Sequence, residues 1–225
     1  MKRKILVLAA VACLAGAAQV YGQFGGLTTI KRPNIANIFK PVVGNGAIYD
    51  ETSKDGSKST MEMSVVDSEM VGTQKGYWME VGHSEGSDEK KYAKLLVTPD
   101  DFVFHKMVMV MPGSPQPILM DMDERRGDKQ RNELKDNLDK WHQVGSETIT
   151  VPAGTFSCEH WTKDDGKGDV WVSSKVSPLA LVKSVEDGRT MVLKQLITGA
   201  KTHITGTPVK FDPQMMMRQR QTQKP

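Results

Sequence analysis

Methionine is the residue type whose number and spacing in this sequence could carry chemistry. The chain of 225 residues holds 14 methionines, and several of them recur two residues apart. These sets are Met61 with Met63, Met107 with Met109 and Met111, and Met120 with Met122. Side chains two residues apart on a β-strand point to the same face, so each set would present its thioethers together. Because methionine is unbranched and adaptable, such a face suits either an apolar binding cavity or plain core packing.

The row of Met107, Met109 and Met111 continues to a histidine, His105, at the same two-residue spacing. Thioether and imidazole groups are ligands that copper accepts, so these four residues form an alternative copper site. Same-face residues on one strand lie about 6.8 Å apart, which is too far for one ion to collect the whole row. Copper binding would therefore need further ligands from neighbouring strands.

Most motifs of the common enzyme classes are absent from the sequence. The chain has no glycine-rich phosphate loop, no HExxH and no CxxC pattern. Gly82-His83-Ser84-Glu85-Gly86 fits the spacing G-x-S-x-G, but it leads from a predicted strand into a turn, whereas the motif of hydrolases needs a turn from a strand into a helix. Asp164-Asp165-Gly166 lacks the spaced oxygen ligands and the final glutamate of a calcium loop, so it predicts a turn. We therefore expect a non-enzymatic protein that has no cofactor.

The N-terminus has the pattern of a secretory signal peptide. Lys2–Lys4 is positively charged, and Ile5–Ala18 is an uncharged apolar stretch that is too short to span a bilayer. Small residues at Val20–Gly22 fit a cleavage site, which predicts a signal peptide over residues 1–22 and a mature start at Gln23. No later segment is apolar enough to cross a membrane, so we expect an exported protein, periplasmic or extracellular. The alternative is a lipoprotein signal that ends at Cys13 and leaves the chain lipid-anchored.

The formal net charge of +3 comes from the basic residues at the N-terminus. Without those three, 27 Lys and Arg balance 27 Asp and Glu, and a neutral chain argues against nucleic-acid binding. Cys158 then remains as the single thiol, so no internal disulfide is expected. We interpret it as a small buried hydrophobe, with a thiol activated by His160, two residues away, as the alternative.

The elements that must position these residues follow a period of two. Charged residues make up 25% of the chain, which is the share of an ordinary globular domain. Alternation of apolar and polar residues predicts half-buried strands, separated by turn signals such as Asp187-Gly188. The predicted strands are 61–65, 77–82, 92–97, 102–111, 117–123, 147–151, 155–162, 169–174, 179–186 and 190–198. Short strands joined by short turns indicate an antiparallel sheet or barrel.

One of these strands, 102–111, is apolar on both faces. Phe104 belongs to one face, and the row that starts at His105 belongs to the other. We therefore expect this strand to be covered on both sides, as in a strongly curved sheet that holds a helix or a ligand.

A single amphipathic helix is predicted over residues 124–141. Leu134, Leu138 and Trp141 form its narrow apolar stripe, and Asp128 is a candidate N-cap. The stripe must pack on the sheet, because the sequence offers no other apolar element. At the two ends, residues 23–43 predict an N-terminal arm or linker, and residues 206–225 predict a disordered basic tail.

Several short phrases of the sequence together resemble a known group of proteins. They include Val151-Pro152-Ala153-Gly154-Thr155-Phe156, Val170-Trp171-Val172 and Gly76-Tyr77-Trp78, within residues 44–198. The set is similar to secreted bacterial proteins of unknown function related to the outer-membrane lipoprotein carriers (LolA/LolB-like). This resemblance implies a mainly β (α+β) domain over residues 44–205. Its fold would be an open, strongly curved antiparallel half-barrel with one helix packed on the concave side.

The lipoprotein carriers hold acyl chains in their concavity, and no cargo-handling residue of theirs maps to a position here. We predict that this protein binds a lipid, a lipidated peptide or another amphiphile in an apolar concavity. Copper binding and an envelope protein-interaction module are the alternatives. The predicted cavity wall consists of Met61, Met63, Tyr77, Met79, Phe104, Met107, Met109, Met111, Leu134, Leu138 and Trp141.

Overall fold

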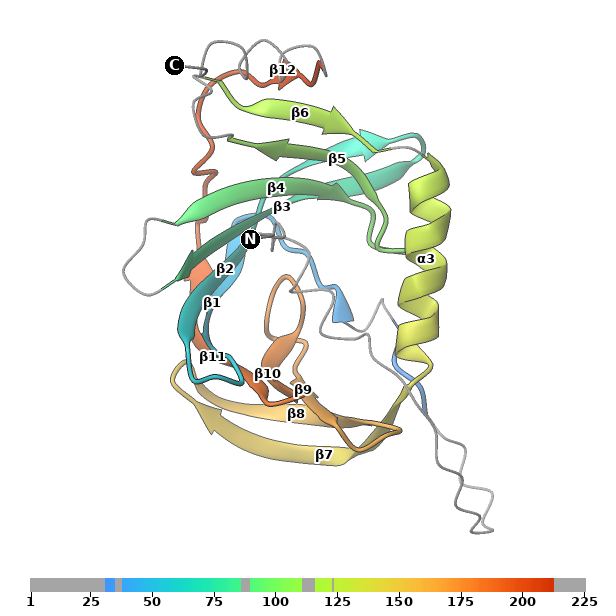
Figure 1. The fold of residues 1–225 in the computed structure, drawn as a ribbon, viewed down its shortest axis with the longest axis vertical. Helices are drawn as coiled ribbons and strands as arrows, with labels where there is room; N and C mark the ends of the chain where they lie inside the picture. Colours follow the sequence, from blue (N-terminus) through green and yellow to red (C-terminus); the bar gives the residue numbers. More distant parts are fainter. Residues whose placement is uncertain (1–30, 35–37, 86–89, 111–115, 123, 213–225) are drawn as a thin grey trace.

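The structure is a computed structural model that describes residues 31–34, 38–85, 90–110, 116–122 and 124–212. Within these residues, twelve strands form one curved sheet that does not close (Figure 1). The strands are β1 (Asn45–Thr52), β2 (Lys58–Val71), β3 (Gln74–Glu85), β4 (Lys91–Val97), β5 (Phe104–Met109), β6 (Ile118–Asp121), β7 (Trp141–Val151), β8 (Gly154–Lys163), β9 (Gly168–Val172), β10 (Leu181–Glu186), β11 (Arg189–Thr198) and β12 (Val209–Lys210). The predicted class, an open and strongly curved β-sheet with one helix, is confirmed.

The helix α3 (Glu124–Leu138) crosses the open side of the half-barrel because of the strand order. The order β12-β6-β5-β4-β3-β2-β1-β11-β10-β9-β8-β7 places β6 and β7 near opposite edges of the sheet. Since α3 connects these two strands, it must span the opening, as Figure 1 shows. Leu134 packs from the helix against the main core, and Leu138 is also buried. No helix among the described residues is long and apolar enough to cross a membrane.

The helix ends earlier than its apolar stripe predicts. Its last residue is Leu138, and Trp141 is the first residue of β7, where it pairs with Lys163. The spacing of Trp141 fits a helix, but burial of its ring beside Trp161 favours the strand. Asp128 is not the N-cap, because the helix begins one turn earlier and the Asp128 side chain pairs with Arg131.

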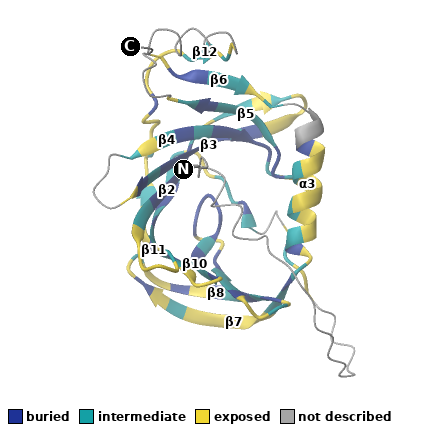
Figure 2. Ribbon diagram, viewed as in Figure 1, coloured by how far each residue is buried: buried dark blue, intermediate teal, exposed yellow. Residues whose placement is uncertain are grey.

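The main core lies inside the half-barrel. Inward side chains such as Tyr49, Met63 and Val97 meet residues that come from outside the strands. The latter are Phe39 from the N-terminal arm, Phe102 before β5, and Val176 and Leu179 from the β9–β10 loop. Figure 2 shows this loop as a buried segment within the curve of the sheet. The deepest part of the concavity is therefore filled by the protein's own chain.

A second apolar cluster covers the opposite face of the upper strands. Trp78, Leu96 and Val108 pack there against Ile204, which follows β11. This segment is held in place by the buried carboxylate of Glu80, which accepts hydrogen bonds from the Thr202 hydroxyl (2.5 Å) and the His203 backbone N–H (2.8 Å). Val108 of β5 belongs to this cluster, whereas Met107 packs against the main core. The expectation that this strand is covered on both sides is thus confirmed.

Two segments outside the predicted half-barrel of residues 44–205 pack on the sheet. On the N-terminal side, Phe39 is almost fully buried in the main core. On the C-terminal side, β12 pairs in parallel with Ile118 and Leu119 of β6. The β12 pairs cover part of the edge that β6 would otherwise leave open. The predicted signal peptide, Cys13 and residues 213–225 lie outside the described residues.

Candidate functional site

Three of the predicted cavity-wall methionines are buried. Met61, Met63 and Met79 all belong to the main cluster. Plain core packing, which the sequence left open as an alternative, describes Met63 and Met79, whereas Met61 also lines a cavity at the ends of β1, β2 and β3.

A second group of methionines remains partly accessible on the same inward face. Met107 lies between Leu95 and Met120 in the strand register, and Met109 lies between Ala93 and Ile118. Directly opposed residues of neighbouring strands share a face, so these side chains form one surface. We call Leu95, Met107, Met109, Ile118 and Met120 the methionine face.

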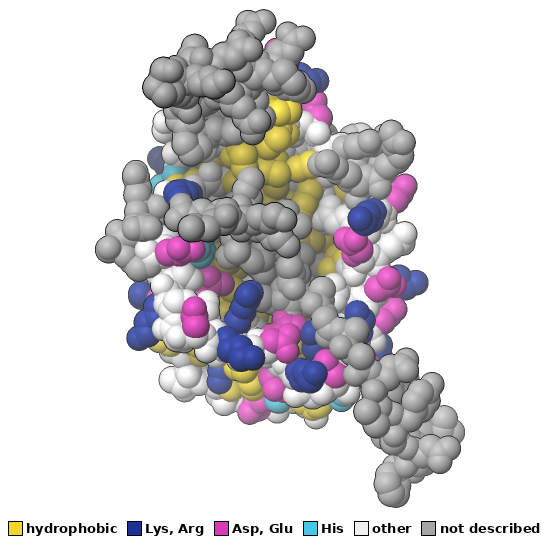
Figure 3. All heavy atoms as spheres, in the orientation of Figure 1, with side chains coloured by type: hydrophobic (Ala, Val, Ile, Leu, Met, Phe, Trp, Pro, Cys, Tyr) yellow, Lys and Arg dark blue, Asp and Glu magenta, His cyan; other side chains and the backbone are white. Residues whose placement is uncertain are grey.

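The methionine face lies on β4, β5 and β6, toward the β12 edge of the sheet, and Leu95 and Met107 connect it to the main core. Met107, Met109 and Met120 are each half-buried, whereas Leu95 and Ile118 beside them are buried. Figure 3 shows hydrophobic side chains gathered in the upper half of this view, where Figure 1 draws β4, β5 and β6. Met122, the partner of Met120 in the sequence pattern, follows β6 and is also half-buried. Met111 lies outside the described residues.

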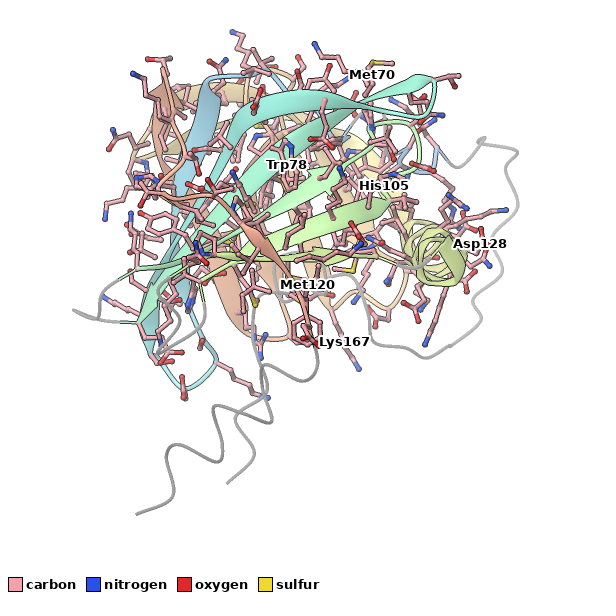
Figure 4. All side chains as sticks on the ribbon, turned by 90° about the horizontal axis from the view of Figure 1, so that it is seen from above. Met70, Trp78, His105, Met120, Asp128 and Lys167 are labelled. Atoms are coloured by element: carbon pink, nitrogen blue, oxygen red, sulfur yellow. The ribbon has the colours of Figure 1, made fainter. Side chains whose placement is uncertain are left out.

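His105 does not continue the methionine row. The ladder pairs Leu96 with Lys106 and Val97 with Phe104, so His105 is an extra residue in a bulge of β5. As a result, Phe104 and Met107 pack against the same core, although simple alternation predicted opposite faces for them. The predicted four-residue copper row is therefore interrupted at its histidine. Figure 4 labels His105 of β5 and Met120 of β6 as separate positions, with Met70 apart from both near the β2–β3 turn.

The His105 ring is instead part of a polar network that ties α3 to the sheet. Its Nε2 lies 3.0 Å from the Thr98 hydroxyl, which donates a 2.6 Å hydrogen bond to Asp101. Asp101 also accepts a hydrogen bond from Arg131 of α3 at 2.8 Å. Burial lowers the pKa of His105, the negative charge of Asp101 opposes this shift, and the positive charges of Arg131 and Lys106 add to it. This network fixes the position of α3 beside the methionine face.

The same link is strengthened by backbone groups around β5. The Gln130 side chain of α3 accepts from the Phe104 N–H (3.3 Å) and donates to the Phe102 carbonyl (3.1 Å). Phe102 adopts a left-handed conformation with φ of 53°, which is strained for a bulky residue. Its ring packs against Phe39 and Phe104, so aromatic contacts hold this conformation.

The remaining predicted wall residues are spread over several sites. Tyr77 is half-buried with the Lys75 ammonium over its ring, and Phe104 and Leu134 pack against the main core. Leu138 and Trp141 line a cavity of about 40 Å³ together with Pro33, Ile38, Glu159, Trp161, Val170 and Val172. This volume holds a few waters at most, so it cannot take an acyl chain.

A larger polar cavity was not recognised in the sequence. It has a volume of about 320 Å³ and lies among the ends of β1, β2, β3, β10 and β11. Inside it, Glu51 accepts a hydrogen bond from Ser59 (2.8 Å) and lies 3.6 Å from His83 Nε2. Among the described residues, no group of three or more His, Cys, Asp or Glu is placed to hold a metal ion. Glu51 lies on β1. The sequence did not predict this strand, because its apolar and polar residues alternate only weakly.

Cys158 is buried on β8 and contacts the main core. Burial raises the pKa of its thiol to about 11, and the negative charge of Glu147 adds to this effect. A thiol with this pKa stays protonated at neutral pH, so it is a poor nucleophile. The structure therefore supports the interpretation of Cys158 as a small buried hydrophobe.

Comparison with known proteins assigns no family to the chain. No family model matches it, and no curated protein does. Among solved structures, an exported protein with a YmcC-like fold from Bacteroides fragilis matches with a TM-score of 0.39 and 11% identity, over 71% of this chain and 98% of that chain. A lipoprotein from Parabacteroides distasonis matches with a TM-score of 0.38 and 15% identity, also over 71% of this chain and 98% of that chain.

MucB gives a TM-score of 0.41 and 12% identity, over 77% of this chain and 60% of that chain. At these scores the likenesses identify neither a family nor an activity. The resemblance to the lipoprotein carriers stays a prediction from the sequence.

Proposed function

We propose that this chain is an exported, non-enzymatic protein that binds the apolar part of a lipid, a lipidated peptide or another amphiphile. The observation that carries the proposal is the methionine face, where Met107, Met109 and Met120 stay half-accessible on the inward side of a curved sheet. The N-terminal pattern of a signal peptide supports export.

The filled concavity limits where such a ligand could lie. Phe39, Val176 and Leu179 share the main core with Met63, so this part of the concavity is packed with the protein's own side chains. Met107 and Met109 of the methionine face belong to the part of the predicted wall that is only half-buried. Each 100 Å² of apolar surface that a ligand covers there would contribute about 2.5 kcal/mol. Methionine side chains can change rotamer at low cost, so the face would tolerate ligands of different shape.

The test compares a charge placed on the methionine face with the same charge placed elsewhere. Met109→Asp introduces a carboxylate beside Ala93 and Ile118, whereas Met70→Asp changes a methionine that is already largely exposed near the β2–β3 turn. The probe is a fluorescent long-chain fatty acid, titrated into protein purified from a bacterial periplasm without detergent. We expect Met109→Asp to weaken probe binding by at least about tenfold, which corresponds to roughly 1.4 kcal/mol.

Met70→Asp should bind the probe like the unmodified protein. Circular dichroism and urea unfolding establish that both variants are folded. Equal probe affinity in a folded Met109→Asp variant would refute the proposed site. Absence of probe binding by the unmodified protein, together with a bare mass in native mass spectrometry, would refute the proposed function.

A further inference from the structure

Within the part of the chain that the structure describes, most of the outer edge of β7 has no strand partner. β7 is the last strand in the sheet order and pairs with β8 on one side (Figure 1). On its other side, the N-terminal arm covers the first residues of the strand. The Gln143 N–H donates to the Lys31 carbonyl at 3.1 Å, and the Arg32 guanidinium donates to the Trp141 carbonyl at 3.1 Å. No described residue pairs with the outer edge of β7 beyond this point.

The free part of the edge runs from Gly145 to Val151. It is bounded by the arm and a bulge at Val144 on one side, and by the Pro152–Ala153 turn on the other. Val151 and Gly154 close that two-residue turn, so the backbone groups of Val151 point toward β8. Because these directions alternate along an antiparallel strand, the backbone groups of Ser146, Thr148 and Thr150 point outward.

This free window is centred on Thr148, which makes it self-complementary. We propose that two copies of the protein associate through β7, paired antiparallel about a two-fold axis at Thr148. In this register Thr148 lies opposite Thr148 of the second copy. Ser146 then lies opposite Thr150 of that copy, and Glu147 lies opposite its Ile149. All outward N–H and C=O groups of the window would be paired without displacing the arm, and the two sheets would become continuous.

The side chains of the window favour this occupant. Proteins usually protect an exposed sheet edge with Lys, Pro or an inward-pointing charge. The stretch from Gly145 to Val151 has neither Lys nor Pro. Its one charged residue, Glu147, lies on the same inward face as Ile149 and Val151. The Glu147 carboxylate is already engaged, because it accepts a 2.5 Å hydrogen bond from Trp171 Nε1 and lies 3.1 Å from His160 Nδ1.

The charge of Glu147 also selects the register. A pairing centred one residue earlier would place Glu147 opposite Glu147 of the second copy, and like charges directly opposite are destabilising. The pairing centred on Thr148 places each Glu147 opposite Ile149 instead. The β-branched residues Thr148, Ile149 and Thr150 have high strand propensity, which suits a central position in the joint sheet.

A cysteine cross-link tests this geometry directly. In the proposed register the two Thr148 Cα atoms would lie about 5.5 Å apart, within the range of a disulfide. Thr148→Cys should therefore form a covalent dimer under mild oxidation. The matched control is Ser157→Cys, since Ser157 is the exposed partner of Thr148 on β8. In the proposed dimer, the Ser157 residues of the two copies would be three strand spacings apart, about 14 Å, which is too far for a disulfide. The native Cys158 is buried and does not compete.

Sedimentation equilibrium of the whole exported chain gives the second measurement. Thr148→Pro removes an outward backbone N–H and leaves the β7–β8 ladder intact, so it should weaken dimerisation at least about tenfold. Thr148→Ala keeps the N–H and should change the dimer dissociation constant by less than about threefold. A chain that is monomeric at every concentration, or a Thr148→Cys variant that cross-links no more than Ser157→Cys, would overturn the proposal. A folded Thr148→Pro variant that dimerises like the unmodified protein would also overturn it. None of these readouts depends on a ligand, so they are independent of the proposed amphiphile binding.

Discussion

Lys163 of β8 and Glu186 of β10 form an ion pair from which solvent is almost excluded, with side chains that are 2% and 8% exposed. The Lys163 ammonium also lies 5.6 Å from the ring centroid of Trp141. Burial raises the pKa of Glu186, while the hydrogen bond from Lys163 opposes this shift. The pair spans β9, so it fixes the relative position of three strands near the β7 edge.

Removing one partner of this pair should be more damaging than removing both. Lys163→Met leaves the Glu186 carboxylate buried without a counter-charge, which costs about 3–5 kcal/mol of unfolding free energy. In Lys163→Met/Glu186→Leu no buried charge remains, so we expect a large part of that loss to be recovered. Urea unfolding of the two single variants and the double variant measures the difference. If the double variant loses the sum of both single effects, the two side chains are not coupled.

Met63 and Met70 test how far the methionines differ in role. Both lie on β2, but Met63 is 1% exposed in the main core and Met70 is 63% exposed. Met63→Ala would leave a cavity and should reduce the unfolding free energy by about 2–5 kcal/mol. Met70→Ala should change it by less than about 0.5 kcal/mol, because no packing is lost. Denaturant midpoints of both variants give the comparison, and similar losses would contradict the assignment of Met63 to the packed core.

Local patterns in the sequence were sufficient to predict the curved sheet and the helix. The alternation around Met61 and Met79 identifies inward faces, and the stripe through Leu134 identifies α3. Strand β1 was not predicted, because Gly46 and the adjacent Asp50 and Glu51 obscure the alternation of its buried residues. It is nevertheless the strand that joins the two halves of the sheet.

The candidate site could be predicted only in part, since its limits depend on contacts between distant segments. The sequence identified Met107 and Met109 as members of one face, but the β5 bulge that removes His105 from their row has no marker in a period-two pattern. Nor does any local pattern indicate that Phe39 and Val176 fill the concavity, because each comes from a loop that is remote in the chain. The open edge of β7 likewise follows from strand order rather than from residue type.

The pKa of His105 gives a prediction about acid stability. Burial lowers this pKa, so the folded protein binds a proton at His105 less readily than the unfolded chain does. The folded state therefore keeps its full stability above the unfolded value of about 6.5 and loses stability as the pH falls below it. We therefore compare the urea midpoints of unfolding at about pH 5 and about pH 8. The difference between the two midpoints should be smaller in His105→Gln than in the unmodified protein.

His142→Gln provides the control for this experiment, since His142 lies on β7 and pairs with Asp164, outside the network of His105. That variant should retain the acid-dependent loss of the unmodified protein. A His105→Gln variant with an unchanged pH dependence would mean that another group is responsible for the loss.

Gly46 is a position where the close approach of β1 and β2 leaves no room for a side chain. A Cβ atom there would lie 2.2 Å from Ser64 Oγ and 2.6 Å from the Met63 carbonyl oxygen. Gly46→Ala should therefore reduce the unfolding free energy by about 1–3 kcal/mol through overpacking. Gly145→Ala is the matched change on β7, where nothing lies within 4 Å of the added Cβ, and it should have little effect.

A second substitution shows whether the backbone or the hydroxyl causes the conflict at Gly46. Ser64→Ala removes Oγ but leaves the Met63 carbonyl oxygen in place, so it should not restore the stability of Gly46→Ala. The close approach would then be a property of the β1–β2 backbone pairing. β1 pairs with β2 on one side and with β11 on the other. Full recovery in Gly46→Ala/Ser64→Ala would instead show that the strands can separate enough to admit a methyl group.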